Sequence, residues 1–177
     1  MPIIINLKED LKNENFIQRN YSIPFKNLNL PEEYSSEKDN VDVNLYIIKE
    51  KDSYVLSMDI DSDIKLQCGR CLEPYHMHLT PKSNVVLSKK KLDGNSELSE
   101  EDLNVEYLED EENFNLNELI REEILVDTPM KPLCSEDCKG ICPICGANKN
   151  INPCNCEKEQ KRKESPFSKL NQLLDKK

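Results

Sequence analysis

The chain has 177 residues and a formal net charge of −10, with 37% hydrophobic and 33% charged residues. This length predicts one domain with at most a small appendage, and the low apolar content predicts a thin core. No stretch approaches the roughly 18 apolar residues of a membrane span, and the apolar run at 3–5 is soon followed by acids, which argues against a targeting segment. We therefore expect a cytoplasmic protein whose thiols stay reduced.

Alternating apolar residues predict antiparallel strands in the first half of the chain. Residues 3–7 have the composition of a short N-terminal strand, whereas 8–40 carry no clear pattern. Two alternating runs joined by a polar turn at 49–52 then predict a hairpin. The first run is Val41, Val43, Leu45 and Ile47, and the second is Leu56, Met58 and Ile60.

Two further predicted strands flank a pair of cysteines. Ile64 and Leu66 share one face of a third strand, which leads directly into Cys68-Gly69-Arg70-Cys71. A fourth strand follows, and residues 85–87 add another. The fourth strand has one face formed by Tyr75, Met77 and Leu79 and the other by His76 and His78. The cysteine pair therefore lies where one strand reverses into the next, which is a suitable place for a metal-binding turn.

The middle of the chain is strongly acidic. Residues 93–127 hold fourteen acids and one base, Arg121, for a local net charge of −13. We interpret about 88–113 as a mobile loop, because it is polar and lacks periodicity. Such a segment is favoured as a solvated loop that keeps the chain soluble, and the alternative is a surface that attracts a basic partner.

A helix is predicted after the acidic loop, with Asn115 as its N-cap and Glu118 three residues later. Pro129 ends it no later than Thr128. Its apolar face is formed by Leu116, Leu119, Ile120 and Ile124. A second short helix is predicted near the C-terminus, where Ser165 is followed by Pro166 at the first helical position. Its apolar stripe is Phe167, Leu170 and Leu174.

The eight cysteines fall into four close pairs, and eight thiolates in such pairs can complete two tetrahedral zinc sites of four sulfurs each. In a reducing compartment this reading is favoured over disulfides. The clearest turn is Cys142-Pro143-Ile144-Cys145-Gly146, in which Pro143 fixes φ and Gly146 allows a left-handed backbone. The predicted metal ligands are Cys68, Cys71, Cys134, Cys138, Cys142, Cys145, Cys154 and Cys156.

Two pairings of these cysteines are open. The preferred one forms a compact site from Cys142, Cys145, Cys154 and Cys156, and leaves the other four to close a loop of more than sixty residues. The rival one groups Cys134, Cys138, Cys142 and Cys145, and joins the last pair to the distant turn. His76 and His78 are alternative ligands, but eight cysteines already suffice, so we favour ordinary surface histidines.

Three segments in order resemble the YceD family, whose members are named for large-subunit ribosomal RNA accumulation. They are Cys68-Gly69-Arg70-Cys71-Leu72-Glu73-Pro74, the helix from Leu116 to Ile124 running on to Pro132-Leu133-Cys134, and Cys138-Lys139-Gly140-Ile141-Cys142-Pro143-Ile144-Cys145-Gly146. The resemblance implies a bacterial cytoplasmic accessory protein needed for synthesis, processing or stability of that RNA. It also implies an association with ribosomal RNA or a basic large-subunit ribosomal protein.

The sequence as a whole predicts an α+β fold, with an antiparallel sheet and a packed helix in residues 1–132 and a cysteine-rich zinc segment in 133–177. No catalytic constellation is visible in the sequence, so a non-enzymatic ribosome-biogenesis factor is favoured. One alternative is a zinc-ribbon nucleic-acid binder, although 128–156 is only +1 and contains no aromatic residue. The other is a thiol redox enzyme using Cys68 and Cys71, which normally requires the pair at a helix N-terminus.

Overall fold

A computed structural model describes residues 1–90 and 105–164, and it divides the chain into two compact units. The sheet unit consists of Met1–Leu66 and His76–Met130, and the cysteine unit consists of Gln67–Tyr75 and the chain from Lys131 on. The boundary between 132 and 133 expected from the sequence stays a prediction. In the structure the turn 67–75 groups with the later cysteines, so the chain passes between the units three times.

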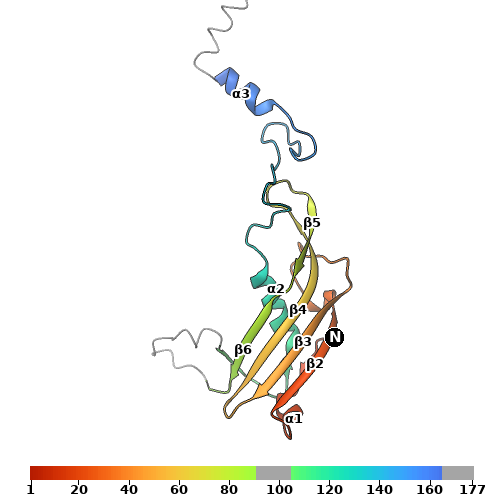
Figure 1. The fold of residues 1–177 in the computed structure, drawn as a ribbon, viewed down its shortest axis with the longest axis vertical. Helices are drawn as coiled ribbons and strands as arrows, with labels where there is room; N and C mark the ends of the chain where they lie inside the picture. The colour runs from red at the N-terminus through yellow and green to blue at the C-terminus, as the bar shows by residue number, and fades with distance from the viewer. Residues whose placement is uncertain (91–104, 165–177) are drawn as a thin grey trace, which may run out of the picture. The chain divides into compact units, whose positions relative to one another are not determined.

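Most of the regular structure belongs to a six-stranded sheet with the order β2-β3-β4-β6-β7, in which β5 also pairs with β4 (Figure 1). The short strands β1 and β8 form a separate antiparallel pair. In chain order the elements are β1 (Ile4–Ile5), α1 (Leu7–Asp10), β2 (Phe16–Pro24), the 3-10 helix η1 (Phe25–Leu28), β3 (Asn40–Lys49), β4 (Ser53–Gln67), β5 (Pro74–Leu79), β6 (Lys82–Ser88), β7 (Val105–Tyr107), β8 (Phe114–Asn115), α2 (Leu116–Asp127) and α3 (Cys156–Glu164).

The predicted hairpin is confirmed and is longer than expected. Its second strand and the predicted third strand are one continuous strand, β4, because alternation runs unbroken through its 15 residues. The register places Leu45 opposite Met58 and Ile47 opposite Leu56, so the apolar side chains of both strands share one face. All four of these residues are at most 2% exposed. This face forms the main part of the core.

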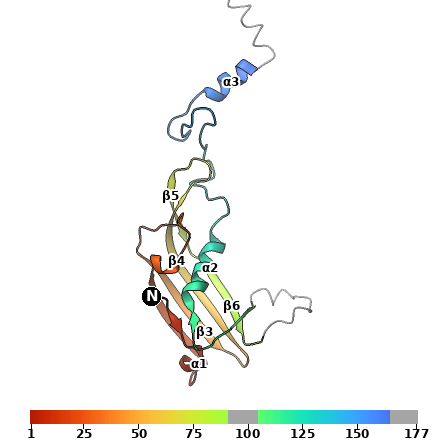
Figure 2. The ribbon, with the colours of Figure 1, turned by 180° about the vertical axis from the view of Figure 1, so that it is seen from behind.

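Helix α2 covers that apolar face of the sheet. It lies behind the strands in Figure 1 and in front of them in the reverse view of Figure 2. The predicted cap is confirmed, since the side chain of Asn115 accepts a hydrogen bond from the backbone of Asn117. Thr128 ends the helix, as Pro129 requires. Its buried apolar residues are Leu116, Leu119, Ile120 and Ile124, as the periodicity predicted.

The N-terminal region, in which local pattern predicted only one short strand, contains several elements. Helix α1 begins at the N-cap Asn6, and β2 pairs along its whole length with β3. Asp10 and Arg19 form an ion pair of 2.7 Å between these two elements. The pairing of β2 is long-range in sequence, and the alternation within it is weak, which is why local pattern failed to predict it.

The predicted acidic loop falls largely on 91–104, outside the described residues. Of its remainder, Val105–Tyr107 form β7, which pairs in parallel with β6, and Leu108 is buried. The helix predicted at 165–177 also lies outside the described residues. Antiparallel-rich sheets with a few helices agree with the α+β class. In the described part of the chain, none of the helices combines the length and apolar character needed to cross a bilayer.

Candidate metal centres

The eight cysteines come together in two groups of four, both within the cysteine unit. In each group the four sulfur atoms all lie within 4.8 Å of one another. The first group is Cys68, Cys71, Cys134 and Cys138, and the second is Cys142, Cys145, Cys154 and Cys156. This is the preferred pairing, and the rival pairing is not formed.

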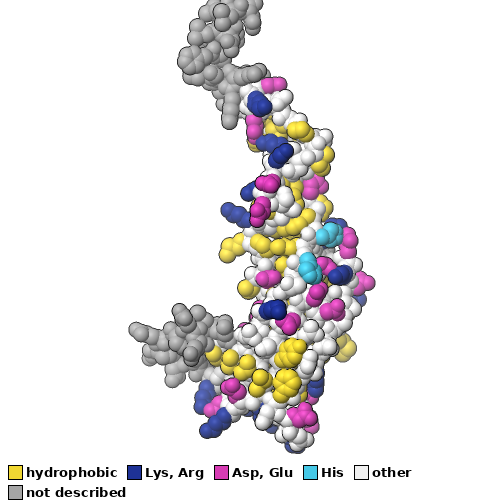
Figure 3. Space-filling view, in the orientation of Figure 1, with side chains coloured by type: hydrophobic (Ala, Val, Ile, Leu, Met, Phe, Trp, Pro, Cys, Tyr) yellow, Lys and Arg dark blue, Asp and Glu magenta, His cyan; other side chains and the backbone are white. Residues whose placement is uncertain are grey.

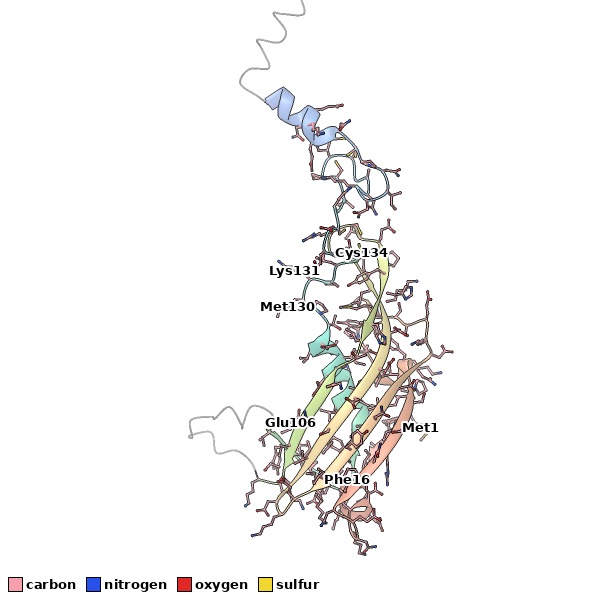
Figure 4. The ribbon with its side chains drawn as sticks, in the orientation of Figure 1. Met1, Phe16, Glu106, Met130, Lys131 and Cys134 are labelled. Atoms are coloured by element: carbon pink, nitrogen blue, oxygen red, sulfur yellow. The ribbon has the colours of Figure 1, made fainter. Side chains whose placement is uncertain are left out.

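The first group is assembled on the turn between β4 and β5. The backbone N–H of Gly69 donates to the carbonyl oxygen of Pro132 at 2.8 Å, which brings the later chain beside the turn. The guanidinium of Arg70 donates to the carbonyl oxygens of Glu136 at 2.9 Å and Cys138 at 3.2 Å. Figure 4 labels Cys134 beside this turn. Arg70 thus orders the segment that carries the second pair of sulfurs.

The two cysteine turns have the same backbone hydrogen bonds. In the first turn the N–H of Cys68 donates to Glu73 at 2.9 Å, and that of Leu72 donates to Cys68 at 3.0 Å. In the second, the N–H of Cys142 donates to the carbonyl oxygen of Ala147, and that of Gly146 to Cys142, both at 2.8 Å. The residue after the second cysteine is left-handed in both, with φ 62° at Leu72 and 71° at Gly146. The left-handed backbone predicted at Gly146 is therefore confirmed.

Packing differs between the groups. Cys68, Cys71 and Cys138 are buried and pack with Tyr75 and Leu133 in a small apolar cluster. In the second group only Cys142 is buried. The first group therefore has a small apolar core of its own. The second group has backbone hydrogen bonds but little apolar burial.

Two contacts place the segment that leads to the second group against the first. A Cβ on Gly140 would lie 3.0 Å from the carbonyl oxygen of Arg70, so the close approach requires glycine there. The side-chain amide of Asn150 donates to Cys138 Sγ at 3.4 Å and accepts from the N–H of Lys139 at 2.9 Å. Its side chain lowers the pKa of Cys138 by stabilising the thiolate. No sequence pattern pointed to Asn150, because its hydrogen-bond partners are brought to it only by the tertiary structure.

The thiol pKa values diverge within each group. Burial raises the pKa of Cys68, but donors including the backbone N–H groups of Cys134, Cys71 and Arg70 outweigh it and lower that pKa to about 6. Hydrogen bonding with Cys138 raises the pKa of Cys134 to about 12. Backbone donors lower the pKa of Cys142 to about 7, while Cys145 raises that of Cys156 to about 12. Hydrogen-bond donors thus favour the thiolate at Cys68 and Cys142, whereas neighbouring sulfurs oppose a second negative charge at Cys134 and Cys156, which a bound cation would compensate.

The geometry fits a tetrahedral dication bound by sulfur. Four sulfurs around zinc lie about 3.7 Å apart, given a Zn–S bond of about 2.3 Å. The Sγ–Sγ distances are 3.8 Å for Cys68–Cys138, 3.7 Å for Cys71–Cys134 and 3.6 Å for Cys145–Cys154. Four thiolates leave no open coordination position, which is typical of a structural rather than a catalytic site.

The remaining candidates lie elsewhere. His76 Nε2 is 3.3 Å from Glu37, and His78 Nδ1 is 2.8 Å from Asp63, so neither histidine belongs to a sulfur group. The Cys68–Cys71 pair lies between two strands, and two further sulfurs converge on it. A redox pair would instead lie at a helix N-terminus with its sulfurs available to each other and to a substrate.

Comparison with known proteins gives a consistent result. The family model described as "Large ribosomal RNA subunit accumulation protein YceD" matches residues 56–174. A curated protein from Arabidopsis thaliana, "Large ribosomal RNA subunit accumulation protein YCED homolog 1, chloroplastic", is 24% identical over 161 residues, covering 77% of this chain and 50% of that protein. The chain thus spans about half the length of that relative. No solved structure matches the chain.

Proposed function

We propose, because this chain belongs to the YceD family, that it is a non-enzymatic factor supporting the synthesis, processing or stability of large-subunit ribosomal RNA. The family name and the name of the Arabidopsis relative support a role in accumulation of that RNA. The family is named for an RNA outcome and not for a reaction. The presence of two closed sulfur groups in place of an open metal site also favours a scaffold over a catalyst.

The proposal rests most directly on the two groups of four sulfurs, which would make the protein a zinc-stabilised scaffold. Each would hold one structural zinc ion, the first through Cys68, Cys71, Cys134 and Cys138 and the second through Cys142, Cys145, Cys154 and Cys156. When bound, zinc supplies a cross-link between chain segments and neutralises thiolate charge. A reducing compartment such as the cytoplasm would keep these thiols available for metal, and the cytoplasm is the location we propose.

The direct partner would be ribosomal RNA or a basic protein of the large subunit. The acidity of the chain favours the protein, because a net charge of −10 repels phosphate at long range and attracts lysine and arginine. A zinc-ribbon nucleic-acid binder is the second candidate, and its support is that each sulfur group contains one cysteine turn with the same backbone hydrogen bonds. Binding of purified protein to large-subunit RNA across a salt series separates the two.

The cellular test compares the ratio of large- to small-subunit ribosomal RNA in a strain lacking the gene with that in complemented strains. We expect the ratio to fall in the deletion, to recover with the wild-type chain and with Ile144→Ser, and to stay low with Cys138→Ser. Ile144 lies between two cysteines of a turn, is 50% exposed and is not a metal ligand, so it is the matched control. An unchanged ratio in the deletion strain would contradict the proposed function.

A further inference from the structure

An apolar row crosses the outward face of the sheet, on the side opposite α2. In register across five neighbouring strands it is formed by Phe16, Ile48, Val55, Val86 and Val105. Phe16 is 50% and Ile48 47% exposed, and the three valines are partly exposed. An antiparallel sheet with one solvated face normally carries polar residues there. Figure 3 shows apolar side chains gathered over this lower part of the sheet.

The row is held rigidly at its β2 end. The ring of Tyr46 stacks on Phe16 with centroids 6.5 Å apart, and Figure 4 labels Phe16 at this corner. The hydroxyl of Tyr46 accepts a hydrogen bond from the side chain of Gln18 at 3.2 Å. A preorganised apolar surface loses little conformational entropy on binding, and exposed apolar patches of this kind mark interaction sites.

Farther along the same outward face lies a cluster of aspartates. Asp42 and Asp61 are directly opposite each other in the register of β3 and β4, and Asp59 lies one outward position along from Asp61. Like charges directly opposite each other on neighbouring strands destabilise a sheet. His78 Nε2 is 3.8 Å from Asp61, but its other ring nitrogen contacts Asp63 at 2.8 Å. Lys38 pairs with Asp63 and also lies near Asp42 and Asp61, and Lys82 Nζ is 3.5 Å from Asp59. Four aspartates therefore face two lysines of this chain, and a cation from a partner would stabilise the negative charge that remains at the Asp42–Asp61 pair.

The distance between the apolar row and the Asp42–Asp61 pair indicates how long the partner segment must be. Ile48 and Asp42 are six residues apart on β3, which corresponds to about 20 Å at about 3.3 Å per residue. An α-helix covers about 20 Å in about 13 residues. We propose that this face docks a basic protein segment, with apolar side chains on the row and a lysine or arginine at the Asp42–Asp61 pair.

Other occupants fit less well. RNA bases can stack on aromatic side chains, but the aliphatic side chains of the row offer no such platform, and RNA phosphates would be repelled by the aspartates. A second copy of this chain would bring the same aspartates and another net charge of −10. The proposal deepens the proposed function by locating where a basic partner binds, and it rests on that function only for the source of the partner.

The binding test uses the full, zinc-loaded chain and, as the probe, RNA-free protein extracted from purified large ribosomal subunits. With a photo-crosslinking benzoylphenylalanine in place of Ile48, we expect cross-links to one or a few basic proteins. The same group in place of Val126, which is 83% exposed on α2, is the control position and should give none of them. Absence of a cross-link from position 48, or the same products from both positions, would overturn the proposal.

Two variants then test the chemistry with the cross-linked partner in purified form. Ile48→Glu and the double variant Asp42→Asn/Asp61→Asn should each weaken binding at least about tenfold, which is typical for loss of a central contact. The melting temperature of the free double variant is measured alongside, and a value at or above that of wild type shows that lost binding is not caused by misfolding. Binding equal to wild type in both variants would overturn the proposal, as would a wild-type dimer that Ile48→Glu converts to monomer.

The outcome can be separated from that of the proposed function. If the deletion strain loses large-subunit RNA and Ile48→Glu restores it fully, the docking surface is wrong while the proposed function stands. If deletion leaves the RNA unchanged while the position-48 cross-link and the variant effects are observed, the docking surface stands and the proposed function is wrong.

Discussion

The sheet unit and the cysteine unit are stabilised by different interactions. In the sheet unit, β3, β4 and α2 bury a continuous apolar face that includes Leu45, Leu56 and Ile120. In the described part of the cysteine unit, the buried apolar residues are Cys142 and a small cluster around Cys68, Cys71 and Cys138, while Ile141, Ile144 and Ile151 are exposed. A segment with so little apolar burial needs another source of stability, and the proposed zinc ions would supply it by cross-linking the convergent sulfurs. One chain thus combines a unit stabilised by an apolar core with a unit whose stability would come largely from the proposed metal ions.

The largest effect is expected from Cys142→Ser, which tests whether the cysteine unit is stabilised independently of the sheet unit. Structural zinc contributes about 10–16 kcal/mol in small peptides at neutral pH, so loss of one ligand should unfold the second sulfur group and leave the sheet unit folded. Metal analysis should fall from two zinc ions per chain to one, and amide hydrogen exchange should rise in 139–156 only. Ile144→Ser, in the same turn, should keep both ions. Loss of protection throughout the sheet would show that the units are not independently stabilised.

Ile120→Ala tests whether the sheet unit is stabilised by its apolar core. Ile120 is 0% exposed on α2, and truncating such a side chain costs about 2–5 kcal/mol. We expect a lower melting temperature for the sheet unit by circular dichroism, with two zinc ions still bound below that temperature. Val126→Ala changes an exposed residue of the same helix and should alter stability by no more than about 0.5 kcal/mol. Release of zinc by Ile120→Ala in the folded state would contradict the separation of the units.

Asn150→Ala tests whether a hydrogen bond to Cys138 raises the metal affinity of the first sulfur group. Its amide is a hydrogen-bond donor to Cys138 Sγ, and partners of this kind typically change metal affinity by about 10–100-fold. Competition with a chromophoric chelator should show one of the two zinc ions weakened by that factor, with the fold intact. The control is Asn152→Ala, whose exposed side chain lies two residues away. If both zinc ions bind to Asn150→Ala as tightly as to the wild-type chain, Asn150 does not contribute to metal binding.

Glu111→Gln gives the smallest expected effect and concerns the sheet unit. Its carboxylate accepts from the Tyr54 hydroxyl at 2.7 Å and pairs with Lys89 at 2.9 Å. Burial opposes ionisation, but these two partners outweigh it and lower the pKa of Glu111. The stabilisation is therefore complete above the unfolded pKa of about 4.3 and is lost as pH falls through the lower folded value.

We expect Glu111→Gln to lower the free energy of unfolding by roughly 1–2 kcal/mol at pH 7, with a difference that narrows below about pH 4 in urea titrations. Glu109→Gln, in the same acidic segment, is exposed and should match wild type. A difference that stays constant down to pH 3 would show that the carboxylate charge is not responsible. A test of whether this acidic segment attracts a basic partner should therefore keep Glu111, which stabilises the fold, and change Glu109 instead.

Local pattern was sufficient where a residue's role depends on its sequence neighbours. Alternation identified the buried face of the β3–β4 hairpin, and the Asn115 cap and Pro129 bounded α2, because these signals act within a few residues. The cysteine spacings likewise identified all four sulfur pairs. The choice between two pairings was also made from spacing, and the structure groups the sulfurs in the preferred way.

Tertiary structure decided whatever depends on partners far along the chain. The long pairing of β2 with β3, the buried position of Leu108 and the anchoring of Glu111 by Tyr54 join residues that no local period relates. The outward apolar row has the same origin. Each strand contributes one apolar side chain to the row, and only the register of five strands aligns these side chains into one surface. Sequence determines which side chains are available, and pairing between distant strands determines which of them act together.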